Sequence, residues 1–150
     1  MIYVGIDVGK KGALAILNDD TLEIKCHYFD YDKYKEIFRY CQQSKCVVFI
    51  ESVHAMPHQG VTSMFNFGQH FGQLLGMLDI LDIPYELVNP QKWKKEFSCT
   101  ADKNTSIQVA KRLFPTVSLK PTERCTKDSD GMAEALLIME YGRRHYGNRN

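Results

Sequence analysis

The chain has 150 residues, of which 44% are hydrophobic and 25% are charged, with a formal net charge of +1. A domain of this length buries roughly two-thirds of its unfolded surface, so it needs neither disulfides nor a structural metal to be stable. The sequence contains no apolar run of membrane-spanning length and no basic, apolar leader at its start. We therefore expect one soluble, cytoplasmic domain covering residues 1–150.

The cysteines indicate a reducing environment. Their number is odd and no CxxC pair is present, so reduced thiols are favoured over disulfides or a zinc site. They are Cys26, Cys41, Cys46, Cys99 and Cys125.

Charge is distributed unevenly along the chain. Residues 1–90 carry seven Lys/Arg against eleven Asp/Glu, a net charge of −4, whereas residues 91–150 carry twelve against seven, a net charge of +5. This asymmetry fits a protein that meets phosphate with its C-terminal half, although a solvated charged surface would explain it equally well.

The first third of the chain is predicted to be mostly strands. Residues 2–8 and 12–18 form two apolar runs joined by the turn GKKG, and residues 22–29 alternate like a half-exposed third strand. Residues 32–43 have helical spacing of apolar side chains. The run CVVFIE at 46–51 has the continuous hydrophobicity of an interior strand.

The remainder is predicted to be mainly helical. A long helix covers residues 62–82, and PYELV adds one short strand. The later segments are a short turn around QKWKKEF, a helix at 103–113, a polar loop from Pro115 to Ser129 and a terminal helix at 130–146. This order predicts an α/β fold with a sheet of mixed direction.

Acidic residues stand at positions where charge needs an explanation. Asp7 and Glu51 end apolar strands, and Asp130 and Glu134 are spaced to share one face of a helix. Buried acids that converge repel one another unless a cation neutralises them, and hard oxygen ligands favour Mg²⁺ or Mn²⁺. Two such ions are a common device for hydrolysing phosphodiesters, so the pattern suggests a nuclease.

Each acid also has a simpler explanation. Asp7 could accept backbone hydrogen bonds at a strand end, and with Gly9 and Gly12 it resembles the phosphate loop of actin-like sugar kinases. Asp130 and Glu134 could be first-turn acids that favour the helix dipole. Glu51, which follows VVFI, is the hardest of the four to explain as a solvated surface acid.

Taken in order, these motifs resemble the RuvC family of Holliday-junction resolvases, particularly its bacteriophage-type members, which have a ribonuclease H-like fold. The resemblance spans nearly the whole chain and implies a mixed five-stranded sheet flanked by helices. It is carried by GIDVGKKGALAIL, by FIESVHAMPHQGVTSMFNFGQHFGQLLGML, by the stretch from VNPQKWKKEF to TADKNTSIQVAKRLFP, and by MAEALLIMEYG.

The resemblance implies a metal site with two Mg²⁺ or Mn²⁺ ions per subunit, held by Asp7, Glu51, Asp130 and Glu134. The family usually has an acid or histidine three residues before the last acid, but Gly131 occupies that position here. We take Asp130 as the substitute and keep Asp128 as a reserve.

Basic residues are expected at the scissile phosphate and along the DNA backbone. The resemblance places Lys94 and Lys103 near the scissile phosphate, where a lysine can offset charge in the transition state. We predict that Lys103 is catalytic, together with the four acids. Further expected DNA contacts are Lys10, Lys11, Lys92, Lys95, Ser106, Lys111 and Arg112.

The predicted long helix carries aromatic residues beside the proposed site, and His54 and His58 lie in the loop before it. Phe65 or Phe67 could stack on bases where a junction opens, although core packing explains each ring as well. For His54, His58 and His70 we expect loop or surface roles.

The same helix carries a glycine stripe, Gly68, Gly72 and Gly76, which would let another helix approach closely. The resemblance implies that this helix pairs two subunits into a homodimer, which suits an enzyme that makes two symmetric nicks. The function expected is therefore metal-dependent resolution of four-way or branched DNA. A noncatalytic nucleic-acid-binding module on the same fold and a ribonuclease H-type hybrid nuclease remain as alternatives.

Overall fold

Five strands in the described part of the chain form one mixed sheet in the order β3-β2-β1-β4-β5. The structure is a computed structural model that describes residues 1–55 and 57–147, so the last residues of the expected 1–150 domain lie outside the description. The strands are β1 (Ile2–Asp7), β2 (Ala13–Asn18), β3 (Glu23–Tyr28), β4 (Cys46–Glu51) and β5 (Tyr85–Val88). β1, β2 and β3 form an antiparallel meander, and β4 and β5 lie parallel to β1.

The described helices are α1 (Tyr31–Gln42), α2 (Val61–Ile80), α3 (Pro90–Glu96), α4 (Lys103–Leu113) and α5 (Asp130–His145). All of them except α2 begin where the sequence supplies a side-chain capping group. The side chains of Asp30, Asn89, Asp102 and Ser129 each accept a hydrogen bond from a backbone amide in the first turn of the helix that follows. Such caps satisfy amides that have no partner inside the helix.

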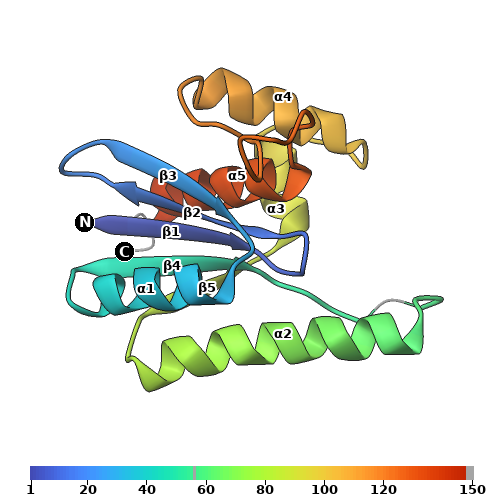
Figure 1. The fold of residues 1–150 in the computed structure, drawn as a ribbon, viewed down its shortest axis with the longest axis horizontal. Coiled ribbons are helices and arrows are strands. Elements are labelled where there is room, and N and C mark those ends of the chain that lie inside the picture. The colour runs from blue at the N-terminus through green and yellow to red at the C-terminus, as the bar shows by residue number, and fades with distance from the viewer. Residues whose placement is uncertain (56, 148–150) are drawn as a thin grey trace.

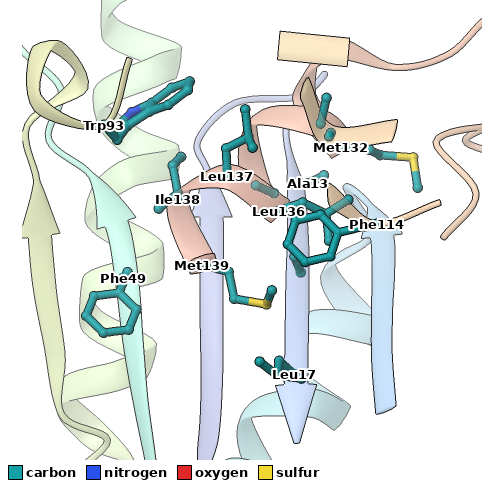
Figure 2. Close-up of a cluster of buried hydrophobic side chains, with 14 of the residues drawn as sticks. Ala13, Leu17, Phe49, Trp93, Phe114, Met132, Leu136, Leu137, Ile138 and Met139 are labelled. Atoms are coloured by element: carbon teal, nitrogen blue, oxygen red, sulfur yellow. The ribbon is translucent and has the colours of Figure 1, made fainter. Parts of the chain in front are cut away.

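The helices cover both faces of the sheet. Figure 1 shows α1 and α2 on one face and α4 and α5 on the other, with the N-terminal part of α2 extending beyond the edge where β1 and β4 end. One core cluster joins the sheet to α1 and α2 through side chains such as Ile6, Phe38 and Leu74. The other joins it to α3, α4 and α5, and Figure 2 shows Trp93 and Leu136 among its buried side chains.

α5 lies unusually close to the central strand because β1 has a glycine at position 5. A Cβ atom built on Gly5 would lie 2.3 Å from the carbonyl oxygen of Ala135 and 2.4 Å from the amide nitrogen of Met139. No side chain larger than hydrogen fits between strand and helix at this point. The glycine therefore sets how near α5 can bring its own side chains to the end of β1.

The sequence-based expectations for fold class and element order are confirmed. The helix expected at 103–113 has those bounds, and the other elements begin and end within two residues of the expected positions. The QKWKKEF segment forms a short helix rather than a turn. None of the described helices is long and apolar enough to cross a membrane.

Candidate active site

Two neighbouring parallel strands bring Asp7 and Glu51 to one edge of the sheet. Ile6 of β1 pairs with Ile50 of β4, so the acid that follows each isoleucine stands at the carboxyl end of its strand. α5 crosses the same sheet and supplies Glu134 from its second turn. Three acids far apart in sequence thus converge where three elements meet.

The three carboxylates form a compact cluster. One carboxylate oxygen from each of Asp7, Glu51 and Glu134 lies within 4.8 Å of the other two. Burial raises the pKa of all three acids, most strongly that of Asp7, whose pKa the charges of Glu134 and Glu51 raise further. Carboxylates held in this way favour a divalent cation between them, and an all-oxygen donor set suits Mg²⁺ or Mn²⁺.

Two lysines lie near enough to this cluster for their charges to act on the acids. The charge of Lys94 opposes the rise in the pKa of Glu51 and Glu134, and the charge of Lys103 opposes it for all three acids. Lys103 lies at the start of α4 and Lys94 in α3, which are the elements expected to carry them. The roles predicted for them at the scissile phosphate stay predictions.

Asp130 stands apart from the three-carboxylate cluster. It lies near enough for its charge to raise the pKa of Asp7 and Glu134, but its carboxylate forms an ion pair with Lys103. Asp128, the reserve candidate, is paired with Lys111 instead. The structure therefore brings Glu134 into the cluster and leaves the role predicted for Asp130 untested.

Gly131 departs from the family pattern for a steric reason. A Cβ atom at this position would lie 2.3 Å from the carbonyl oxygen of Lys11 and 3.0 Å from Oδ2 of Asp7. The β1–β2 turn and Asp7 thus occupy the space that a side chain would need. An acid or histidine at position 131 is therefore incompatible with this packing.

Trp93 is a site residue that sequence analysis missed. Its ring is fully buried, and its Nε1 donates a hydrogen bond to Oε1 of Glu51 at 3.2 Å. This bond helps to hold the Glu51 carboxylate at the sheet edge and opposes the rise in its pKa. A signal was present, because a buried tryptophan needs a partner for its N–H and this one is the only tryptophan of the chain.

The expected DNA-contacting residues are distributed over several surfaces. Lys10 and Lys11 are exposed on the β1–β2 turn, and Lys92 and Lys95 are exposed on α3. Arg112 is exposed on α4, where it lines a cavity with Glu96 and Arg144. A phosphate backbone could reach each of these exposed side chains.

Ser106 requires a correction. Its side chain is fully buried on the inner face of α4, and its hydroxyl has no hydrogen-bond partner among the described residues. It therefore does not lie at a surface where DNA could touch it. The helical period of α4 explains this, since Ser106 and Ala110 share the face that packs inward.

The aromatic residues of α2 and the three histidines divide between surface and interior. Phe65 is 71% exposed, whereas Phe67 is partly buried against the core cluster that joins the sheet to α1 and α2. The surface role expected for His70 is wrong, because its side chain is only 7% exposed and packs against Phe29 at a ring-centroid distance of 4.5 Å. His58 is exposed, and His54 lies 3.4 Å from the hydroxyl of Ser52.

The glycine stripe of α2 faces away from the sheet. Cβ atoms built on Gly68, Gly72 and Gly76 would meet nothing within 4 Å. The buried residues His70, Leu74 and Leu78 occupy the opposite side of the helix. The stripe is therefore open, which is compatible with the predicted subunit contact but does not test it.

Structural comparison shows that the fold is similar to that of solved RuvC structures. A T. thermophilus RuvC in complex with Holliday junction substrate matches with a TM-score of 0.60 and 12% sequence identity, and the match covers 97% of both chains. A second Thermus thermophilus RuvC structure matches with a TM-score of 0.57 and 14% identity over 96% of both chains. No protein-family model and no curated protein matches the sequence. The chain thus has a RuvC-like, ribonuclease H-like fold at very low sequence identity.

Proposed function

We propose that this chain is a single-domain, divalent-metal-dependent DNA endonuclease that resolves four-way junctions, and other branched DNA, by paired nicks. The observation that carries the proposal is the cluster of Asp7, Glu51 and Glu134 at the edge of a RuvC-like sheet. An apolar residue would fill any purely structural role at these positions better than a buried acid. The alternative of a noncatalytic module does not explain why all three are present.

The residues would divide the work as follows. Asp7 on the central strand, Glu51 and Glu134 would hold two Mg²⁺ or Mn²⁺ ions, with Asp130 as a further ligand once its pairing with Lys103 is exchanged. The ions when bound would activate water and stabilise the leaving oxygen for in-line displacement at phosphorus. Trp93 orients Glu51, and Lys94 and Lys103 offset negative charge on the substrate phosphate.

The proposal predicts a defined cleavage pattern. Wild-type protein is incubated with a labelled synthetic four-way junction, a linear duplex and an RNA/DNA hybrid, each with Mg²⁺ or with EDTA. We expect paired symmetric nicks in the junction alone, and their loss in EDTA or in the variant Glu51→Gln. Cutting of the hybrid alone would identify a ribonuclease H-type enzyme. Tight junction binding without any cutting would identify a noncatalytic module.

Paired nicks require two sites, and we propose that the open face of α2 supplies the subunit contact. Phe65 and Val61 lie about one and two turns before Gly68 on that face and are 71% and 86% exposed. Apolar residues and glycines on one side of a helix suit close packing against a second copy.

The variant Gly72→Arg is expected to convert dimer to monomer in sedimentation measurements at several protein concentrations. Gln42→Arg, an exposed change on α1, serves as the control and should leave the mass unchanged. Equal masses for wild type and Gly72→Arg would rule out this contact.

A further inference from the structure

A cavity of about 420 Å³ lies beside the proposed active site. Its walls come from the β1–β2 turn, the segment between β3 and α1, and the N-terminal half of α2. Gly9 and Lys10 of the turn line it, only two and three residues after Asp7. Its volume falls within the roughly 300–1,000 Å³ range of small-molecule sites.

Aromatic rings form much of the lining. Phe29, Tyr31, Phe67 and His70 all border the cavity. Phe29 contacts Tyr31 and His70 edge-to-face, at centroid distances of 5.1 and 4.5 Å, and Phe67 packs against the turn at Gly9. Rings gathered at one cavity can stack on a flat, unsaturated ligand.

His70 is a polar group that the fold itself does not satisfy. Neither of its ring nitrogens has a hydrogen-bond partner among the described residues, although the side chain is 93% buried, being 7% exposed. Burial lowers the pKa of this imidazole and so favours its uncharged form. The two nitrogens themselves have almost no exposed surface, so His70 offers the cavity an aromatic ring rather than a hydrogen-bonding group.

The polar lining restricts the chemistry of such a ligand. Asn66, Gln69 and Gln73 contribute side-chain amides, and the hydroxyl of Tyr31 donates to Oε1 of Gln73. Among the described residues of the lining, Lys10 is the only charged one. Amides read the hydrogen-bonding edges of bases, aromatic rings stack on them, and a lysine at the rim suits the attached phosphate.

We propose that this cavity receives one unstacked nucleobase of the strand that is cut, next to the scissile phosphate. The inference rests on the proposed function. Stacking between the rings and hydrogen bonds to the amides would hold the base, and Lys10 would contact its phosphate. Junctions favour this arrangement because bases at a branch point cost less to unstack than bases within a duplex.

The test asks whether a change in the cavity and the removal of a single base affect cleavage through the same contact. The variant Gln69→Ala/Gln73→Ala removes two exposed amides from a helix that tolerates alanine. Junctions carry one abasic site at a time at each nucleotide flanking the cut. At one position we expect base removal to slow single-turnover cleavage by wild type about tenfold. The variant should cut the intact junction about tenfold more slowly and lose nothing further from the abasic site.

The control variant Gln42→Ala, an exposed helical glutamine outside the cavity, should behave as wild type on every substrate. The cavity assignment would be overturned if base removal slowed the variant further at every position, or if no position were sensitive to base removal in wild type. The proposed nuclease activity would still stand. If wild type neither binds nor cuts the intact junction, the proposed function fails and this inference fails with it.

Two further arms identify the source of the base. In the Glu51→Gln complex, 5-iododeoxyuridine at the sensitive position should photo-crosslink to the segment 28–31 or 63–73, and crosslinking elsewhere would overturn the proposal. Free deoxynucleoside monophosphates at about millimolar concentration should not slow cleavage. Inhibition by them that disappears in Gln69→Ala/Gln73→Ala would identify a free nucleotide as the occupant and overturn the assignment to DNA.

Discussion

Asp7 illustrates how much the local surroundings change a single acid. Burial is the main cause of its raised pKa, and the charges of Glu134 and Glu51 add to the effect. The folded chain therefore holds this carboxylate in a position that is unfavourable for the ionised protein alone. The same position becomes favourable once positive charge is supplied.

The variant Asp7→Asn should therefore stabilise the metal-free protein while removing its response to metal. Near neutral pH in EDTA we expect its melting temperature to rise by about 2–4 °C for each kcal/mol of repulsion relieved. Mg²⁺ should stabilise wild type but not the variant. Thermal unfolding with and without Mg²⁺ measures both effects. A variant that melts below wild type in EDTA would contradict the electrostatic account.

Trp93 is expected to affect metal binding more than stability. Trp93→Phe keeps an aromatic ring in the core but removes the N–H that holds Glu51. Loss of such an outer hydrogen bond typically lowers metal affinity or activity about 10–100-fold. A Mg²⁺ titration of junction cleavage would show the shift. Phe114→Leu, which shrinks the same core cluster elsewhere, should lower stability without moving the Mg²⁺ dependence.

At the scale of elements, the contact between β1 and α5 determines the site. Residues 5 and 131 are glycines because the helix backbone and the β1–β2 turn approach so closely there. Glu134 reaches the strand ends only with this approach. The geometry of the acids is thus a consequence of helix-on-sheet packing rather than of any local motif.

Gly5→Ala tests this packing directly. The added methyl group has no room, so we expect the free energy of unfolding to fall by about 1–3 kcal/mol. Displacement of α5 should weaken Mg²⁺ binding at the same time. Gly72→Ala is the matched control, since its methyl group meets nothing within 4 Å and helix propensity should raise monomer stability by up to about 1 kcal/mol. Denaturant unfolding of the two variants gives the comparison, and equal effects would contradict it.

Over the whole molecule, the cluster makes stability depend on pH and metal together. Asp7, Glu51 and Glu134 have raised pKa values in the folded state, so the folded chain binds more protons than the unfolded chain above about pH 4. These groups therefore lower stability as pH rises from about 4 through their folded pKa values. Below that window both states are protonated and the effect vanishes.

In EDTA, the contribution of the cluster should reduce the melting temperature of wild type relative to Asp7→Asn as pH rises above about 4. Stabilisation by Mg²⁺ should grow over the same range, because the cation competes with protons for the carboxylates. Melting curves of both proteins across this range test the sign. A wild-type melting temperature that rises with pH more steeply than that of the variant would contradict it.

Sequence by itself determined the elements and two of the acids. Hydrophobic periodicity and capping residues such as Asp30 and Ser129 act over a few neighbouring positions, so the helices and strands could be predicted closely. Asp7 and Glu51 could be predicted as partners because an acid after an apolar parallel strand lies at the common carboxyl edge. Each of these inferences depends on local interactions or on sheet periodicity.

Only the tertiary structure decided the contacts between distant segments. It placed Glu134 in the cluster and left Asp130 paired with Lys103, and it joined Trp93 to Glu51. It also buried His70 in the wall of a cavity, contrary to the surface role expected for it. These outcomes depend on how closely α5 and α2 pack on the sheet. The distances between packed elements leave no periodic signal in the sequence.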